Sequence, residues 1–485
     1  MFKRILIANR GEIALRGIRA CRNLGIESIA IYSDYDTHCL HVKNADKAIP
    51  LGGFENEETY LNIQKIIDIA KENKCEAIFP GYGFLSENAD FASACENNDM
   101  VFIGPLSDSI KKMGNKIQAR ALMKQAGVPV KPGSDGPIKS LEEAIAISES
   151  AGYPIMIKTA RGGGGKGIRV VYSAEELKQN LDESIKEAKN SFGENNSVFI
   201  EKYFEAGKHI EVQVLGDSYG NIIHLGEREC SIQRRYQKLL EEAPSPSLDD
   251  NLRKQIHEIG VKAGQAVNYR GAGTVEMMIF NVDGKPKVYF IEMNTRIQVE
   301  HPITEMITNI DIAQEMIRVA AGERLKYRQE DITFKGHAIE CRINCEDPEN
   351  NFMPSTGEIT ELKVPQGEGI RFDSQLYLGY TIPHKYDSLI GKLIAHAENR
   401  PACIEKIKKA LNQLIIEGVE TTIPLHNQIL KDHEFLEGTY MTNFISQILH
   451  QIETERKKLC NGTNINYAAL GSQGCYLHDS LVGMK

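Results

Sequence analysis

Long apolar runs and paired cysteines are both missing from this chain of 485 residues. No segment approaches the roughly 20 consecutive apolar residues of a membrane-spanning helix, and charges interrupt residues 1–14 too early for a signal peptide. The ten cysteines contain no CxxC pair and follow no regular spacing, so neither a metal cluster nor a disulfide framework is expected. Reduced thiols of this kind indicate a cytoplasmic protein without membrane association.

A surplus of positive charge is missing too. Lysine and arginine number 57 against 66 aspartate and glutamate, and the net charge is −9. This balance argues against a broad nucleic-acid surface, although it leaves room for a local basic pocket. The hydrophobic share of 41% is that of an ordinary globular protein, and the length predicts two to four domains.

The dinucleotide fingerprint is a third absence. Short apolar stretches at residues 3–8, 28–33, 77–80 and 101–104 alternate with helix-like runs, which predicts a parallel sheet built from βαβ units. However, the first turn reads Asn-Arg-Gly-Glu over residues 9–12 instead of G-x-G-x-x-G. A nicotinamide nucleotide is therefore not expected there.

The densest glycine run lies between two predicted strands, residues 153–158 and 168–172. Four consecutive glycines, Gly162–Gly165, let backbone N–H groups approach a polyanion, and Lys166 adds positive charge. The run is not a P-loop, because Gly167 follows the lysine and no helix follows. The pattern favours a movable flap over phosphates, and the alternative is a flexible surface hairpin.

A predicted hairpin further along carries two carboxylates. If it is symmetric about Gly284, Glu276 and Glu292 face each other on adjacent strands, where like charges repel. A Mg²⁺ ion between them removes that cost. The alternative is a solvated sheet face with no ligand.

The residues after the hairpin decide between these alternatives. In EMNTRIQVEH, every even position from 292 to 300 is polar, and in an extended segment all five side chains point to one side. Arg296 can fork onto a small planar anion such as bicarbonate, and Glu300 can take a proton from it. An ordinary solvated strand shows the same alternation, but it has no reason to combine metal, anion and base groups.

Three other polar groups have structural alternatives. Arg234 and Arg235 belong to a basic run that is most simply a solvated face, and His209 is most simply a satisfied structural histidine. Arg342 lies on a strand-like segment, 336–344, as either a surface residue or a second anion anchor.

Together these segments closely resemble biotin carboxylase, the ATP-grasp component of biotin-dependent carboxylases. The resemblance covers about residues 1–445 and rests on ILIANRGEIA, PGYGFLSEN, the glycine run, EKYFE, HIEVQV, QRR…QK, EMNTRIQVEHP and GHAIECRIN. EMNTRIQVEHP is the most specific of them. The competing interpretations are another ATP-grasp ligase, which would lack the Arg296–Gln298–Glu300 set, and a non-catalytic nucleotide-binding regulatory subunit.

The resemblance implies an α/β protein with an ATP-grasp fold. We expect an N-terminal Rossmann-like domain at 1–115 and an ATP-grasp domain at 116–335, whose mobile glycine-flap lid spans about 131–203. A C-terminal α+β domain follows at 336–445, and residues 446–485 form a tail of unknown role.

The resemblance also implies the site. ATP contacts are expected from Lys116, Lys158, Gly164, Gly165, Glu201, Lys202, Phe204, His209, Gln233, Tyr236, Glu276 and Glu292. Glu276, Glu292 and Asn294 would hold Mg²⁺ or Mn²⁺, and Lys238, Arg296, Gln298 and the Val299 backbone would hold bicarbonate. Biotin would meet Tyr82 and Arg342, and the catalytic residues would be Lys238, Arg296, Glu300 and Arg342.

The implied reaction is ATP- and bicarbonate-dependent carboxylation of biotin through carboxyphosphate. No segment fits a biotinyl domain or a carboxyltransferase, so both partners, the biotin carboxyl carrier protein and the carboxyltransferase, are expected as separate chains. A homodimer is common in the family. Acetyl-CoA is the first expectation for the final acceptor, and pyruvate or another acyl-CoA or 2-oxoacid is the alternative. Three departures from the family pattern, Phe79, Arg161 and Tyr236, remove no residue assigned to chemistry.

Overall fold

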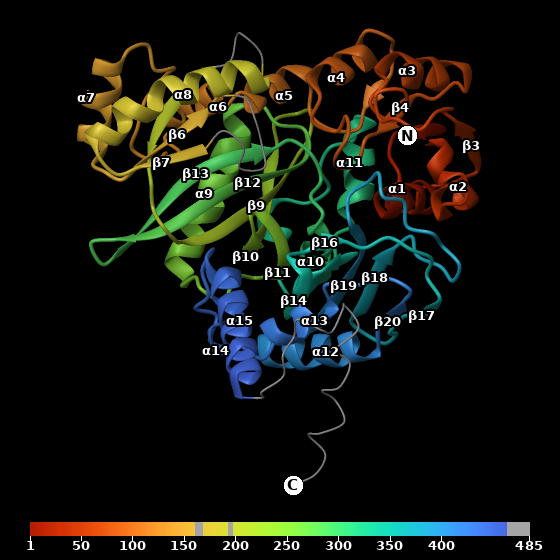
Figure 1. The fold of residues 1–485 in the computed structure, drawn as a ribbon. Coiled ribbons are helices and arrows are strands. Elements are labelled where there is room, and N and C mark those ends of the chain that lie inside the picture. The colour runs from red at the N-terminus through yellow and green to blue at the C-terminus, as the bar shows by residue number, and fades with distance from the viewer. Residues whose placement is uncertain (161–167, 193–196, 463–485) are drawn as a thin grey trace.

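The computed structural model describes residues 1–160, 168–192 and 197–462, and its N-terminal layer is a five-stranded parallel sheet (Figure 1). The strand order is β3-β2-β1-β4-β5, and helices cover the sheet because its strands are apolar on both faces. The predicted strands are confirmed to within one or two residues, but β3 was not predicted. The elements are β1 (Arg4–Ile7), α1 (Gly11–Asn23), β2 (Glu27–Tyr32), α2 (Leu40–Asn44), β3 (Lys47–Pro50), α3 (Ile63–Glu72), β4 (Ala77–Phe79), α4 (Ala89–Glu96), β5 (Val101–Phe102) and α5 (Ser107–Gly114).

A small antiparallel sheet of order β7-β6-β8 follows, packed against two helices. The predicted strands on both sides of the glycine run are confirmed and pair with each other, which excludes a P-loop arrangement. The glycine run itself, with Gly164 and Gly165, lies outside the described residues. The elements are α6 (Lys116–Gln125), α7 (Leu141–Ala151), β6 (Ile155–Thr159), β7 (Ile168–Val171), α8 (Ala174–Phe192) and β8 (Val198–Lys202).

The largest sheet has eight strands in the order β13-β12-β9-β10-β11-β14-β19-β18 (Figure 1). Strands β11 and β14 pair antiparallel, so the sheet runs without a break across the boundary expected at residues 335 and 336. Residues from both segments therefore lie side by side in one sheet. Its elements up to β14 are β9 (Lys208–Gly216), β10 (Ile222–Arg234), β11 (Gln237–Ala243), α9 (Asp250–Ala266), β12 (Gly271–Val282), β13 (Lys285–Asn294), α10 (His301–Thr308), α11 (Ile312–Ala320) and β14 (His337–Asn344).

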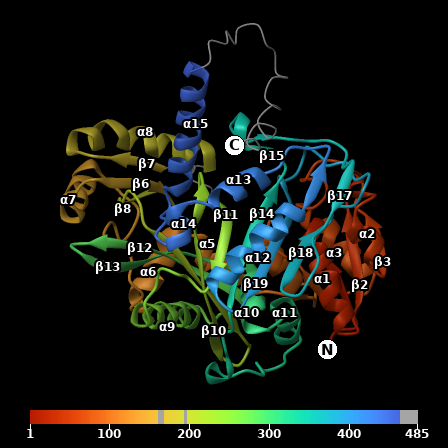
Figure 2. The ribbon, with the colours of Figure 1, turned by 90° about the horizontal axis from the view of Figure 1, so that it is seen from below.

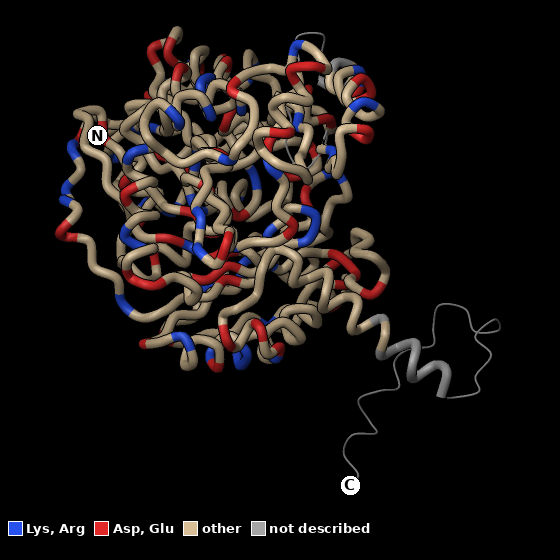
Figure 3. The backbone as a smooth tube through the Cα atoms, turned by 90° about the vertical axis from the view of Figure 1, so that its left-hand side faces the viewer, with Lys and Arg blue, Asp and Glu red and all other residues tan. Residues whose placement is uncertain are grey.

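The C-terminal segment mixes short strands with helices, as an α+β unit does. Helix α15 includes the start of the expected tail; Phe444, Ile445 and Ile448 are buried at its beginning, and it then projects from the body (Figure 2). Basic and acidic positions are interspersed over the view in Figure 3, so neither sign dominates it. Among the described helices, none is long and apolar enough to cross a membrane. The elements are β15 (Glu346–Asp347), β16 (Met353–Pro354), β17 (Glu361–Lys363), β18 (Ile370–Ser374), β19 (Leu389–Ala397), α12 (Arg400–Gln413), β20 (Ile415–Glu417), α13 (Ile423–Ile429), α14 (His433–Glu437) and α15 (Phe444–Gly462).

Candidate active site

A cavity of about 1080 Å³ opens between the three sheets. Most of the described residues that were predicted to bind ligands or catalyse line it, although they come from segments more than 200 residues apart. Three of them do not: Glu201, Lys202 and Glu300 lie behind its wall. The lining residues are Tyr82, Lys116, Lys158, Phe204, His209, Gln233, Tyr236, Lys238, Glu276, Glu292, Asn294, Arg296, Gln298, Val299 and Arg342.

The two hairpin carboxylates face each other, as predicted, but for a different reason. The turn is centred between Asp283 and Gly284, whose φ values of 52° and 76° form the tight two-residue turn typical of Asp-Gly. That register pairs Val282 with Lys285 and would not bring the carboxylates opposite each other. A β-bulge after Glu276 adds one residue on β13, and Glu276 then pairs with Glu292. The predicted symmetry about Gly284 is therefore wrong for most of the hairpin.

The charges around this pair are unequal. Glu276 accepts from Asn294 (2.8 Å) and Lys238 (3.0 Å), and its other oxygen lies 3.1 Å from His209 as an ion pair. Burial would raise the pKa of Glu276, but Lys238 and His209 outweigh it and hold the pKa well below its usual range. Among the described residues Glu292 pairs only with Lys116, at 3.9 Å, and burial together with the Glu276 charge raises its pKa. The two carboxylates and the Asn294 amide form an oxygen donor set that suits a hard divalent cation.

The chain after the hairpin departs from the prediction. Strand β13 ends at Asn294, and residues 295–299 form a loop that leads into α10 instead of an extended strand. The loop still gathers the polar groups, because Arg296 donates to Asn294 (3.1 Å) and to Gln298 (3.0 Å). The Nε of Arg296 donates to Glu87, from the N-terminal segment, at 2.8 Å. No sequence pattern pointed to Glu87, since it lies 209 residues away.

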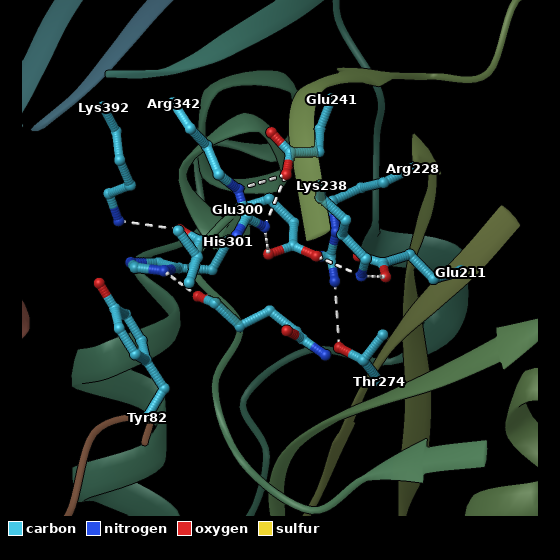
Figure 4. Close-up of polar contacts among 12 residues, drawn as sticks. Tyr82, Glu211, Arg228, Lys238, Glu241, Thr274, Glu300, His301, Arg342 and Lys392 are labelled. Atoms are coloured by element: carbon cyan, nitrogen blue, oxygen red, sulfur yellow. Dashed lines mark hydrogen bonds and ion pairs between the residues drawn. The ribbon is translucent and has the colours of Figure 1, made fainter. Parts of the chain in front are cut away.

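Glu300 is fully buried between two cations from neighbouring strands (Figure 4). One oxygen accepts from Lys238 at 2.6 Å, and the other accepts from Arg342 at 2.9 Å. Arg342 also donates to Glu241 at 2.6 Å. Burial would raise the pKa of Glu300, but Lys238, Arg342 and Arg228 lower it well below its usual range. Glu300 is thus ionised and doubly paired in this arrangement.

A second buried ion pair, between Glu211 and Arg228, also contacts Lys238, and the sequence analysis did not predict it. Glu211 on β9 bonds to Lys238 and, at 2.5 Å, to the fully buried Arg228 (Figure 4). Arg228 also donates to Gln213 (2.8 Å) and Thr274 (3.0 Å). The available signal was the alternation of His, Glu and Gln along HIEVQV, which sets three polar side chains on one face of an otherwise apolar strand.

Lys392 is another missed residue. It is wholly buried, donates to the Val299 carbonyl at 2.8 Å and pairs with Glu12 at 3.0 Å. The hydroxyl of Tyr82 also donates to Glu12. The candidate biotin contact, Tyr82, is therefore linked through Glu12 and Lys392 to the candidate bicarbonate loop.

At the other end of the cavity, Lys158 pairs with Glu201 at 2.8 Å, and Arg120 donates to the same carboxylate at 3.1 Å. Burial would raise the pKa of Glu201, but these cations lower it to about 2. The Lys202 side chain turns away, toward the carbonyls of residues 152 and 153, at 2.9 Å each. Phe204 stacks on Phe280 and supplies an aromatic wall.

The remaining candidates divide between surface and core. Arg234 bonds to Asn351 and lies over the Phe352 ring, so it is a surface residue, as the solvated-face alternative expected. Tyr236 is 63% exposed at the tight β10–β11 turn. Phe79 is fully buried in β4 and packs in the core. Arg161 lies outside the described residues.

Comparison with known proteins gives one consistent family. Three family models match in order: "Biotin carboxylase, N-terminal domain" at residues 1–110, "Carbamoyl-phosphate synthase L chain, ATP binding domain" at 115–328 and "Biotin carboxylase C-terminal domain" at 340–447. Biotin carboxylase 1 of Bacillus subtilis is 53% identical over 445 residues, 92% of this chain and 98% of that protein. One pyruvate carboxylase subunit, from Methanothermobacter thermautotrophicus, is 48% identical over 459 residues, 95% of this chain and 92% of that one.

A solved structure agrees. The biotin carboxylase domain dimer of Hydrogenobacter thermophilus 2-oxoglutarate carboxylase, in complex with MgADP, ADP and bicarbonate, superposes with a TM-score of 0.87 at 50% identity. The match covers 93% of this chain and 98% of that one. This confirms the ATP-grasp fold class predicted from the sequence, with its N-terminal parallel sheet.

Proposed function

This chain belongs to the biotin carboxylase family and is a ligase of that kind, and on this premise we propose the course of its reaction and the residues that carry it out. The substrates proposed are ATP, bicarbonate and biotin carried on a separate biotin carboxyl carrier protein. One observation carries the proposal: Glu300 lies between Lys238 and Arg342, beside the Glu276–Glu292 pair and within one loop of Arg296. The proposed base, the anion-binding residues and the proposed metal ligands thus lie close together at one end of the cavity.

In the first stage, Arg296, Gln298 and the Val299 backbone hold bicarbonate, and Glu300 removes its proton. A base with a strongly lowered pKa is weak. When Lys238 and Arg342 turn from Glu300 to the incoming oxyanions, two of the three charges that lower its pKa are withdrawn. The pKa of Glu300 then rises toward its ordinary value, so substrate binding itself activates the base.

The deprotonated bicarbonate oxygen then attacks the γ-phosphorus of ATP, and ADP leaves. Lys116 and Lys238 stabilise the charge that develops on the phosphoryl oxygens, and catalysis is mainly positioning and electrostatics. The product, carboxyphosphate, releases CO₂, and the phosphate takes the ureido proton of biotin. Arg342 stabilises the resulting enolate, whose ureido nitrogen attacks the CO₂ to form carboxybiotin, and Tyr82 lies along the biotin ring.

The donor set fits Mg²⁺ or Mn²⁺ at Glu276, Glu292 and Asn294. The raised pKa of Glu292 indicates that a second negative charge beside Glu276 is unfavourable until a cation is present. The ion would supply charge neutralisation for the phosphate oxygens. The related Hydrogenobacter domain was solved with MgADP and bicarbonate, which supports the same ligands here.

The proposal also includes the final carboxyl acceptor and the partner proteins. Our first choice is acetyl-CoA, and the relatives named as subunits of pyruvate and 2-oxoglutarate carboxylases keep the 2-oxoacids as the alternative. A carboxyltransferase on a separate chain would complete the complex, and the dimer in the Hydrogenobacter structure supports a homodimer. Eight cysteines, all with side chains that the structure describes, are free and buried, in keeping with a cytoplasmic enzyme.

The test is phosphate release from ATP with Mg²⁺ and bicarbonate, with and without free biotin. We expect bicarbonate-dependent turnover that biotin raises and that Arg296→Ala abolishes. The matched control is Arg328→Ala, because the Arg328 side chain is 75% exposed and does not line the cavity. Turnover indifferent to biotin would indicate another ATP-grasp ligase, and nucleotide binding without turnover would leave the regulatory alternative standing.

A further inference from the structure

Lys131 lines the same cavity, yet none of the roles assigned above uses it. Only 7% of the residue is exposed. Its ammonium lies 5.1 Å from the centre of the Phe280 ring. Within residues 1–160, 168–192 and 197–462, its side chain forms no ion pair or hydrogen bond. A buried ammonium without an acceptor is costly, and its place on a ligand cavity indicates that a ligand supplies the acceptor.

The backbone holds Lys131 firmly at the junction of two sheets. Pro129 O accepts from Phe290 N on β13, and Pro132 O accepts from Lys202 N on β8, both at 2.8 Å. The segment therefore bridges the edge of the large sheet and the edge of the small one. Gly133 makes the close approach possible, since a Cβ there would lie 2.1 Å from the Ile200 carbonyl oxygen. The side chain between these anchors has little freedom to leave the cavity.

The charges facing Lys131 do not balance. Lys158 from β6 and Arg120 from α6 lie nearby, and Glu201 from β8 is already bonded to both. Three cations therefore share one carboxylate. Burial, with Lys158, lowers the pKa of Lys131 to about 8, and Glu201 compensates only in part. A ligand that brings a hydrogen-bond acceptor to Lys131 would offset the cost of burying its ammonium.

Resting on the proposed function, we propose that Lys131 is a further nucleotide-binding residue, which donates from the cavity wall to an acceptor nitrogen of the ATP base. The base end is favoured over the phosphate end because the Lys131 ammonium lies near the Phe280 ring, which stacks on Phe204, and this aromatic wall suits a flat aromatic ligand. The carboxylates proposed for the metal, Glu276 and Glu292, mark where the phosphates lie. Lys158 is already paired with Glu201, whereas Lys131 can donate to the base without breaking an ion pair.

The decisive variant is Lys131→Met, which keeps the length of the side chain and removes its charge. Calorimetric titration with ADP, with adenosine and with inorganic tripolyphosphate separates the base from the phosphates. We expect Lys131→Met to weaken ADP and adenosine alike, by about tenfold or more, and to leave tripolyphosphate unchanged. Lys124→Met is the matched control, because that lysine is 56% exposed and outside the cavity.

The outcomes are distinct. Unchanged ADP affinity would overturn the proposal, and so would equal weakening of ADP and tripolyphosphate with adenosine unaffected, which would make Lys131 a phosphate contact. Failure of the wild type to bind any of the three would count against the proposed function itself. Removing an uncompensated buried charge does not threaten folding, so the melting temperature of Lys131→Met should equal or exceed that of the wild type.

A pH series gives a second readout that a purely structural role would not move. Lys131 is charged below its pKa of about 8 and loses its proton above it. The affinity advantage of the wild type over Lys131→Met for ADP should therefore shrink between pH 7 and pH 9.5. A constant ratio over that range would contradict donation by the ammonium.

Discussion

The two ends of the cavity handle charge in opposite ways. At the end proposed for bicarbonate, the buried cations have carboxylate partners in excess: Lys238 has three, and Arg342 has two. At the nucleotide end, Lys131, Lys158 and Arg120 share Glu201. A fully paired cluster keeps its geometry without a ligand, whereas a cation surplus is relieved only when an anion arrives. One end is thus organised for chemistry in advance, and the other is organised to bind.

The largest expected effect comes from the centre of the paired end. Glu300→Gln keeps the shape but removes the base and the charge that holds Lys238 and Arg342. We expect kcat for biotin-dependent phosphate release to fall by about 10²–10⁴-fold, the range of general-base contributions. ADP affinity, measured by calorimetry, should change little, because Glu300 does not line the cavity. A loss confined to ADP binding would contradict the role.

Removing one buried cation from each end tests whether the two ends differ in charge balance. Arg228→Met leaves Glu211 buried beside Lys238 alone and should lower the free energy of unfolding by about 3–5 kcal/mol. Lys131→Met at the other end should not destabilise the protein. Denaturant titration of both variants tests the comparison directly. Equal destabilisation of the two would show that charge balance does not distinguish the ends.

Glu201, the carboxylate near Lys131, Lys158 and Arg120, should be sensitive to acid. The pKa of Glu201 is lowered to about 2 in the folded protein, so its stabilising contribution is complete above the ordinary value near 4.5 and is lost as the pH falls toward 2. Glu201→Gln should destabilise the protein by about 3 kcal/mol at pH 7 and should flatten the pH dependence below pH 4.5. Unfolding curves from pH 3 to pH 7 measure both. Parallel curves for the two proteins would rule out this role.

The smallest effect is expected for Glu87, which lies at the solvent-exposed border of the end proposed for bicarbonate. Glu87 is half exposed and holds Arg296 by one bond of 2.8 Å. Glu87→Gln should keep the hydrogen bond but lose its charge, and KM for bicarbonate should change by a few-fold while kcat stays close to wild type. A large fall in kcat would instead place Glu87 in the chemistry.

Sequence reasoning found most of what local pattern encodes. The strands around the glycine run and the paired carboxylates followed from periodicity and turn residues. The bulge after Glu276 did not, because a bulge depends on how β13 meets its neighbours and leaves no residue signature here. Glu87 and Lys392 were missed because each reaches the site from a distant segment as a single polar residue. Lys131 was missed for a related reason: a lone lysine in a loop is usually a surface residue.

The unbroken eight-stranded sheet has a consequence for how this chain can be divided. A cut at residue 335 would separate β11 from β14 and leave two long unpaired edges, each a template for aggregation. The three-stranded unit β7-β6-β8 forms a sheet of its own. Chimaeras between related carboxylases should therefore exchange that unit and keep everything from β9 to β19 from one parent.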